Sequence, residues 1–175
     1  MLSEKLTKAL NEQVKEEYYS AYLYLSMAAF AERAAFKGIA NWLFVQAKEE
    51  MAHGIHMYRY ILERDGTPVF AAIQQPPGSF TGIDGIFEEV LAHEQKITES
   101  INNIASLAMQ ENDHACYQFM MWYVNEQVEE EASAKDIIAK LKILGNDKGL
   151  LFALDHELAK KEFDNPFPAD SKISG

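Results

Sequence analysis

The amino-acid sequence predicts an all-α protein, a bundle of four long helices followed by a short fifth helix. Apolar residues recur at steps of three or four, the period of an amphipathic helix, through four segments of similar length: 3–33, 37–64, 83–110 and 113–144. No segment has the pattern of a strand. A chain of 175 residues is long enough for one well-packed domain. We therefore predict a single domain over 1–175, with the bundle over about 3–144, the fifth helix over about 147–162 and an irregular tail over 163–175.

Capping residues set the predicted helix boundaries. Ser3 can cap the first helix, with Glu4 in its opening turn, and Asp113 can cap the fourth helix. The fourth pattern stops at Gly145, a residue type that commonly follows the last turn of a helix. Asp147 can then cap the short fifth helix.

The connection between the second and third helices is unusually long. Its sequence, "DGTPVFAAIQQPPGSFTG" at 65–82, has no helical period and contains three of the five prolines in the chain. An extended chain covers roughly 3.3 Å per residue, so this segment can run the whole length of the bundle. The other connections between long helices are short. We expect two antiparallel hairpins joined by a crossover that makes the second and third helices parallel.

Charge and composition exclude several classes of protein. The formal net charge of −11 argues against binding to nucleic acids or to anionic membrane surfaces, and it is compatible with gathering cations. No apolar run is long enough to cross a bilayer, and the N-terminus lacks the pattern of a signal peptide. Cys116 is the single cysteine, which rules out an internal disulfide framework. We expect a cytoplasmic protein with no nucleic-acid or membrane partner.

Each of the four apolar stripes carries a glutamate near its middle: Glu17, Glu50, Glu94 and Glu130. These four side chains are expected to meet at one level inside the bundle. Four buried carboxylates cannot all stay ionised without partners, because burial and mutual repulsion raise their pKa values. Two divalent cations would neutralise them. The stripes therefore predict a pair of metal ions in the core.

The spacing Glu-x-x-His places Glu50 and His53 on one face of the second helix. Oxygen ligands with one imidazole suit iron(II), manganese or zinc better than copper(I). We assign Glu17, Glu50 and His53 to one metal ion. Glu50 is placed to bridge to a second ion, which Glu94 and Glu130 would also hold.

The second hairpin departs from this pattern, because Gln127 and Glu130 stand where a second Glu-x-x-His pair would be. Gln127 is then a weak ligand or a hydrogen-bond partner of a ligand. Tyr24 lies one heptad beyond Glu17 on the same stripe, where it can bond to a ligand or donate an electron. One imidazole for two ions makes the sites unequal, and we expect the second ion to bind more loosely.

These motifs resemble those of the ferritins. The chain is similar to haem-free bacterial and archaeal ferritins over nearly its whole length, through Glu17, "EExxH" at 49–53, Glu94 and "EQxEE" at 126–130. The resemblance implies a ferritin-like four-helix bundle that assembles into a 24-subunit shell. It also implies a ferroxidase, which oxidises iron(II) with dioxygen or hydrogen peroxide at a di-iron centre and stores an iron(III) oxyhydroxide mineral inside the shell.

The same resemblance implies a third iron site beside the di-iron centre. Its ligands would be Glu49, Glu126 and Glu129, which flank the pair at the edges of their stripes. All three positions that such a site needs are carboxylates in this chain. We expect it to serve iron transit or electron supply.

The sequence offers two alternative functions. Met51, between Glu50 and His53, stands where haem-binding bacterioferritins carry their methionine ligand, but the second hairpin lacks the Glu-x-x-His of that subfamily, so no haem is expected. A di-iron peroxidase or oxidase is the other alternative, and a single cysteine excludes the Cys-rich domain that rubrerythrins usually add. His56 and His93 lie off the predicted stripes and lack the neighbouring inward glutamate that supports His53 as a ligand.

Overall fold

The computed structural model describes residues 1–145 and 147–167 and contains five helices, whereas the part of the predicted irregular tail over 168–175 lies outside the described residues. The helices are α1 (Glu4–Arg33), α2 (Lys37–Glu63), α3 (Ile83–Gln110), α4 (His114–Leu144) and α5 (Lys148–Leu158). No strand occurs among the described residues. The predicted all-α class is confirmed, and α1 to α4 begin and end within one residue of the predicted positions.

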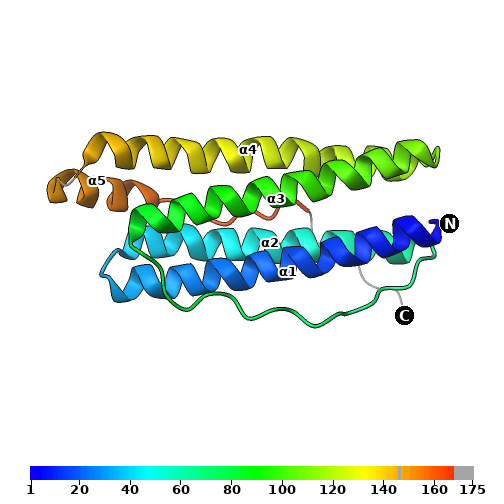
Figure 1. Ribbon diagram of the computed structural model, residues 1–175, viewed down its shortest axis with the longest axis horizontal. Helices are drawn as coiled ribbons and strands as arrows, with labels where there is room; N and C mark the ends of the chain where they lie inside the picture. The colour runs from blue at the N-terminus through cyan, green and yellow to red at the C-terminus, as the bar shows by residue number, and fades with distance from the viewer. Residues whose placement is uncertain (146, 168–175) are drawn as a thin grey trace.

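The four long helices form two antiparallel hairpins, α1 with α2 and α3 with α4 (Figure 1). The crossover runs back along α1 from the end of α2 to the start of α3, so α2 and α3 are parallel, as predicted. α5 lies at the end of the bundle where α4 finishes, in contact with α2 and α4. None of the helices in the described part of the chain is long and apolar enough to cross a membrane.

Two side chains on α1 hold the crossover in place. Asn11 donates a hydrogen bond to the Thr67 carbonyl at 3.0 Å and accepts one from the Val69 amide at 2.6 Å. Further along α1, the Ser26 hydroxyl donates to the Pro77 carbonyl. These bonds satisfy backbone groups of a segment that has no regular partners of its own.

The predicted caps are present. The Ser3 hydroxyl accepts a hydrogen bond from the Leu6 amide at 3.1 Å, and Asp113 accepts one from Cys116 at 2.9 Å. Asp147 accepts from the amides of Gly149 and Leu150 at 2.8 and 3.1 Å. Each cap satisfies an amide that has no partner within its own helix.

The fifth helix ends at Leu158, earlier than the predicted end near residue 162. The amides of Lys160 and Lys161 bond three residues back instead of four, which tightens the last turn. Asn41 on α2 donates to the carbonyls of Ala159 and Lys161 at 3.3 and 2.9 Å. This contact with a distant helix turns the chain onto α2, and sequence periodicity carries no information about it.

The core consists of two apolar clusters separated by a polar layer. One cluster lies nearer the N-terminus and includes Leu6, Leu10, Met57, Ile101 and Met120. The other lies nearer α5 and includes Tyr24, Met27, Leu43, Phe87 and Ile137. Fully burying one such side chain contributes roughly 1.5–3 kcal/mol, so the two clusters offset the cost of burying polar groups between them.

Beyond Met57 the buried stripe of α2 continues through Ile61, which is fully buried, whereas the neighbouring Tyr60 is only half-buried. A helix turns every 3.6 residues, so steps of three and of four from Met57 reach different sides of the stripe. Tyr60 instead stacks on Phe119, with 3.7 Å between ring centroids, and accepts a hydrogen bond from Arg64 near the surface.

Candidate metal centre

The polar layer receives side chains from all four long helices at the same level of the bundle. Its acidic and imidazole members are each at most 7% exposed: Glu17 on α1, Glu50 and His53 on α2, Glu94 on α3 and Glu130 on α4. Gln127 on α4, 4% exposed, and the fully buried Tyr24 on α1 border the same layer. The structure thus brings together the seven residues that were predicted to form and support a pair of metal sites.

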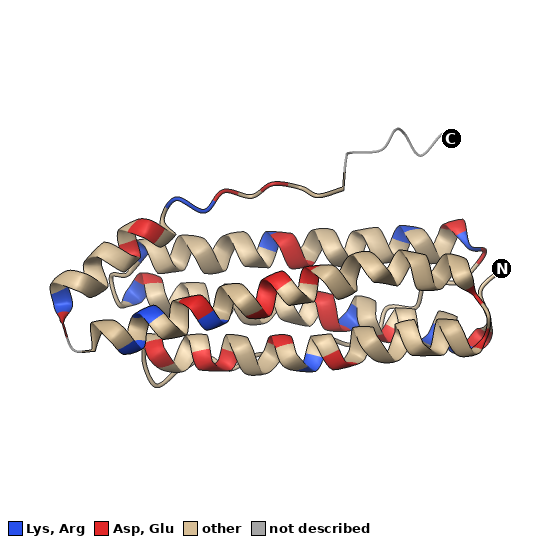
Figure 2. Cartoon of the chain, turned by 90° about the horizontal axis from the view of Figure 1, so that it is seen from above, with Lys and Arg blue, Asp and Glu red and all other residues tan. Residues whose placement is uncertain are grey.

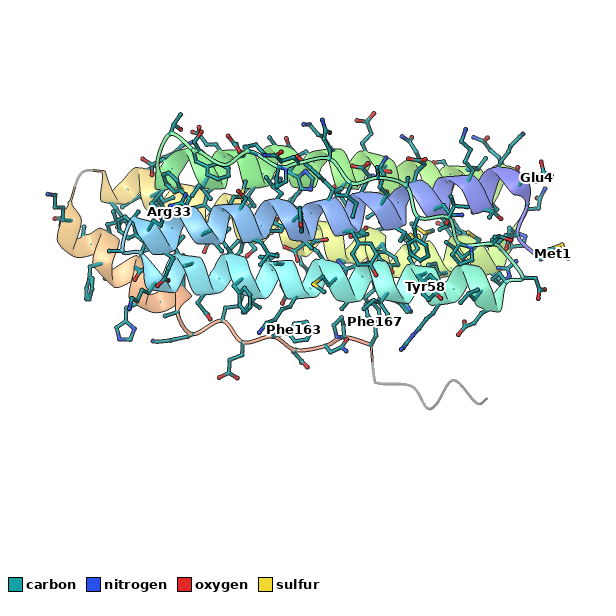
Figure 3. All side chains as sticks on the ribbon, turned by 90° about the horizontal axis from the view of Figure 1, so that it is seen from below. Met1, Glu4, Arg33, Tyr58, Phe163 and Phe167 are labelled. Atoms are coloured by element: carbon teal, nitrogen blue, oxygen red, sulfur yellow. The ribbon has the colours of Figure 1, made fainter. Side chains whose placement is uncertain are left out.

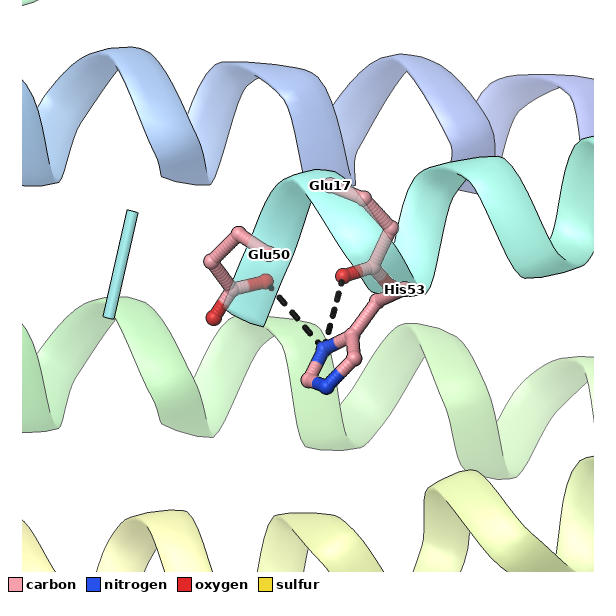
Figure 4. Close-up of side chains that lie close together, drawn as sticks. All are labelled: Glu17, Glu50 and His53. Atoms are coloured by element: carbon pink, nitrogen blue, oxygen red, sulfur yellow. Dashed lines mark ion pairs between the residues drawn. The ribbon is translucent and has the colours of Figure 1, made fainter. Parts of the chain in front are cut away.

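Glu17, Glu50 and His53 form the tightest group (Figure 4). His53 Nδ1 lies 3.7 Å from Glu17 Oε2 and 3.6 Å from Glu50 Oε2, longer than ordinary hydrogen bonds. One ligand atom from each residue lies within 4.8 Å of the other two. Metal–ligand bonds to nitrogen and oxygen are roughly 2.0–2.2 Å, so the three atoms leave room for one cation between them.

Local sequence explains this meeting of α1 and α2. Glu50 and His53 are three residues apart and share a helix face. Gly54, the next residue, faces α1, and a Cβ there would lie 3.3 Å from the Tyr18 ring and 3.4 Å from Glu17 Cβ. The missing side chain therefore allows α1 to approach α2 closely at Glu17. Sequence reasoning did not identify Gly54 as part of this arrangement.

Neutral donors hold the remaining carboxylates. Glu94 accepts hydrogen bonds from the Tyr24 phenol and from Gln127, with 2.9 Å from the Gln127 amide nitrogen to the Glu94 oxygen. Glu130 accepts one from Gln46 at 2.7 Å. Because these donors carry no charge, they orient the carboxylates without neutralising them. No cationic side chain competes with a metal ion for these two carboxyl groups in the hydrogen bonds described.

Sequence reasoning gave no role to the two glutamines that precede the acidic residues by one turn. Gln46 lies one turn before Glu50 on α2, but its hydrogen bond to Glu130 crosses the bundle and has no sequence signal. Gln13 donates to Glu17 at 2.8 Å from four residues earlier on α1. The i,i+4 spacing of Gln13 and Glu17 was the available signal.

His93 was predicted to lie off the apolar stripe of its helix. The structure shows instead that His93 is buried. Its Nε2 lies 2.7 Å from the Ser20 hydroxyl on α1. α3 packs against both α1 and α4, so its buried face is wider than a single stripe. Burial lowers the pKa of His93 to about 4, which keeps this imidazole neutral near pH 7.

Burial and mutual repulsion shift the acidic groups of the layer. Burial raises the pKa of Glu50 well above its ordinary value, and the charges of Glu94 and Glu17 add to the rise. Burial raises the pKa of Glu130 to about 7, with Glu94 contributing. Burial also raises the pKa of Glu94, although the bonds from Tyr24 and Gln127 oppose the rise. The layer therefore retains protons that a bound cation would displace.

His53 and Glu17 form the ionised side of the layer. Burial lowers the pKa of His53, but contacts with Glu17 and Glu50 outweigh burial and hold this pKa well above its usual range. Burial opposes ionisation of Glu17, yet the nearby imidazolium of His53 and the hydrogen bond from Gln13 keep the pKa of Glu17 below its ordinary value. A metal ion between these groups would replace the imidazolium proton as the positive partner.

The layer also contains buried polar atoms without partners. Within the described residues, Gln46 Oε1 and His53 Nε2 are buried side-chain atoms that make no hydrogen bond. Leaving a buried polar atom unpaired costs free energy, so such atoms in an acidic layer indicate a missing partner. The unpaired Gln46 oxygen and the oxygen-rich donor set both fit a divalent cation.

Comparison with known proteins decides the family. The profile of the ferritin family, described as a ferritin-like domain, matches residues 7–144. The chain belongs to the ferritin family. It is similar to bacterial non-heme ferritins from Staphylococcus saprophyticus, 41% identical, and Staphylococcus aureus strain MRSA252, 38% identical, each over 94% of this chain and 98% or 99% of the relative. The resemblance inferred from the sequence is confirmed.

Solved ferritin structures have the same fold. An engineered closed form of the Archaeoglobus fulgidus ferritin is 44% identical to this chain, with a TM-score of 0.92. The match covers 94% of this chain and 100% of the archaeal chain. The open-pore ferritin of the same archaeon is 45% identical, with a TM-score of 0.91, over 92% and 98% of the two chains. This ferritin therefore has the four-helix bundle with a short fifth helix that its sequence predicts.

The three residues predicted to form a third site in this ferritin lie toward the surface. Glu49 and Glu126 are half-buried, and Glu129 is exposed. Burial raises the pKa of Glu126, and the charges of Glu129 and Glu49 contribute to the rise, so the three carboxylates lie within electrostatic reach. Glu49 is paired with Lys161, at 2.7 Å. Met51 is 45% exposed on α2.

Proposed function

We propose that this ferritin is an iron-storage protein with ferroxidase activity. It oxidises iron(II) with dioxygen or hydrogen peroxide in the polar layer of each subunit and keeps the iron(III) as an oxyhydroxide mineral inside a 24-subunit shell in the cytoplasm. Membership of the ferritin family supports the general function. The observation that carries the proposal is the buried group of Glu17, Glu50 and His53, whose ligand atoms lie within 4.8 Å of one another.

In this proposal two iron(II) ions are the substrates. Glu17, Glu50 and His53 bind the first ion, and Glu50 lies between it and a second ion at Glu94 and Glu130. Two iron(II) ions held together would supply two electrons, which with two protons from solvent reduce one dioxygen to hydrogen peroxide, or one hydrogen peroxide to two water molecules. Gln127 and Tyr24 orient Glu94, to which both donate hydrogen bonds. Glu49, Glu126 and Glu129 form the third iron site.

The donor set suits release as well as binding. Carboxylate oxygens are hard ligands that accept iron(III), and one imidazole among four carboxylates does not favour iron(II) strongly. Protons held by Glu50, Glu94 and Glu130 leave when cations arrive, so binding is expected to strengthen as pH rises through about 7. These properties support transit of iron through the layer toward a mineral.

Exposed apolar side chains support self-assembly. Those on α1, on α2 and in the crossover include Tyr22, Leu25, Phe44, Ile55, Val69 and Phe70. Large apolar side chains left exposed on one chain become buried where copies of the chain pack together. A shell of 24 chains of 19.8 kDa would elute near 475 kDa in gel filtration.

The test is aerobic addition of iron(II) to the wild type and to the double variant Glu50→Ala/His53→Ala. The wild type should oxidise iron faster than buffer and keep hundreds of iron atoms per particle in solution. The double variant should keep its elution volume and lose the fast phase. A matched control, Glu99→Ala/His156→Ala, removes the same residue types from exposed positions and should behave as wild type. Oxidation by the wild type at the rate of buffer would refute the proposal.

A further inference from the structure

The chain after α5 lies along the bundle as an extended segment, residues 159–167, which we call the C-terminal strap (Figure 2). It follows α2, and the labelled rings of Phe163 and Phe167 lie beside that helix (Figure 3). Asn41 fixes the start of the strap through the carbonyls of Ala159 and Lys161. The strap therefore has a defined position next to the third-site carboxylates.

Lys161 brings a positive charge to these carboxylates. Its Nζ lies 2.7 Å from Glu49 Oε2 and 5.0 Å from the centroid of the Trp42 ring. The side chains of Lys161 and Glu49 are 25% and 16% exposed, so the pair is largely enclosed. The charge of Lys161 also acts on Glu126 and Glu130, where it opposes the rise in pKa that burial causes. The ammonium group thus lies where a cation at the third site would be attracted.

We propose that Lys161 is a built-in cation that a metal ion must displace from Glu49, so that the C-terminal strap sets the affinity of the third metal site. This inference rests on the proposed function, which assigns Glu49, Glu126 and Glu129 to that site. A protonated lysine has no lone pair and cannot be a ligand itself. It competes with a metal ion for the same carboxylate oxygen, and the metal site opens when the ammonium moves away.

Contacts at the far end of the strap confine the movement to the Lys161 side chain. Phe167 stacks on His56, with 3.7 Å between ring centroids, and lies 4.6 Å from Trp122. Together with the Asn41 hydrogen bonds, these contacts hold the strap backbone at both ends. The lysine has a flexible four-carbon side chain, so its ammonium can leave Glu49 while the strap remains in place.

The experiment counts zinc ions by titration calorimetry on the assembled protein, with zinc as a divalent ion that does not change oxidation state. Lys161→Gln should bind the third zinc about tenfold more tightly, because a neutral amide no longer competes for Glu49. Lys161→Arg keeps the charge and should resemble the wild type. Lys160→Gln removes an exposed charge from the adjacent position and is the matched control. Anomalous scattering at the zinc edge should place the third ion at Glu49.

A further variant tests the strap itself. Asn41→Ala removes the two hydrogen bonds to the strap backbone without changing any charge, and it should tighten the third zinc by about threefold. An unchanged affinity in Asn41→Ala would overturn the role of the strap. An equal third-zinc affinity in Lys161→Gln and wild type, or a third zinc away from Glu49, would overturn the inference. Failure of the wild type to bind the first two zinc ions would instead refute the proposed function.

Discussion

Gln46 on α2 donates a hydrogen bond to Glu130 on α4 across the polar layer, with 2.7 Å between the amide nitrogen and the carboxylate oxygen. The other Gln46 side-chain atom, Oε1, is buried without a partner. The bond fixes one oxygen of Glu130 and leaves the second oxygen able to face a cation. Gln46 therefore orients a ligand of the proposed second metal site, although it was not predicted as a site residue.

The variant Gln46→Leu tests that support. Leucine has a side chain of similar size but no hydrogen-bond donor, so Glu130 loses its fixed orientation. The affinity for the second metal ion should fall by about tenfold, the usual effect of removing a hydrogen bond to a ligand. Anaerobic titration with iron(II) measures this affinity. Gln118→Leu, at an exposed position on α4, is the control. Equal second-ion affinity in Gln46→Leu and wild type would show that the bond has no such role.

The pKa of Glu130 predicts a pH dependence of metal-free stability. Burial raises this pKa to about 7 in the folded protein, from an ordinary value of 4.5. Between these values the unfolded chain binds fewer protons than the folded chain, so the free energy of unfolding falls as pH rises and levels off above about 7. The loss from this one group is on the order of 3 kcal/mol.

Thermal unfolding of metal-free protein from pH 4.5 to 8 measures this dependence. Glu130→Gln has no ionisable group at this position and should unfold with a shallower pH slope than wild type. Added divalent metal should raise the melting temperature of the wild type most at the alkaline end of the range. If the melting temperatures of the wild type and of Glu130→Gln changed with pH at the same slope, the assignment of the proton to Glu130 would be contradicted.

Tyr24→Phe should slow iron oxidation while preserving the fold. The ring of Tyr24 is fully buried and remains so in phenylalanine, but Glu94 loses the hydrogen bond that the phenol donates. We expect the initial rate of iron(II) oxidation to fall by about tenfold. Stopped-flow absorbance measures the rate, and Tyr22→Phe, an exposed position two residues earlier, is the control. An unchanged initial rate would remove Tyr24 from the site.

Gly38→Ala should displace α5. A Cβ at Gly38 would lie 1.6 Å from the backbone oxygen of Asp155, which cannot move without moving the helix. Next to Gly38, the Ile39 amide donates a hydrogen bond to the side-chain carboxylate of Asp155, at 2.8 Å, and a shift of the helix would break it. We expect a loss of about 2 kcal/mol in the free energy of unfolding, typical of overpacking.

Denaturant unfolding and gel filtration check this effect and its consequence for assembly. Gly78→Ala is the matched control, because a Cβ at Gly78 meets no atom within 4 Å, and it should change the free energy of unfolding by less than about 0.5 kcal/mol. A Gly38→Ala protein as stable as the control would show that α5 can shift without cost.

The features that follow helical periodicity were predictable from the sequence. The faces of Glu17, Glu50, Glu94 and Glu130 follow from steps of three and four along amphipathic helices, and the structure buries all four in one layer. The caps at Ser3, Asp113 and Asp147 depend on neighbouring residues and were also correct. The path of the crossover was predicted correctly, because an 18-residue segment without helical period is long enough to run the length of the bundle.

The features that depend on contacts between distant segments were not predictable. The end of α5 is set by Asn41, which lies on another helix. The roles of Gln46 and of Lys161 arise from bonds to Glu130 and Glu49 across the bundle. His93 was missed because one stripe per helix underestimates the buried face of a helix that packs against two neighbours. None of these contacts leaves a period in the sequence.

The most direct test is anomalous scattering from crystals of the assembled protein soaked anaerobically in iron(II). Two iron peaks should lie in the polar layer of every subunit, with Glu50 between them, Glu17 and His53 on one ion, and Glu94 and Glu130 on the other. Iron peaks confined to the surface, with no density among these five side chains, would contradict the assignment of the layer as the iron-oxidising centre.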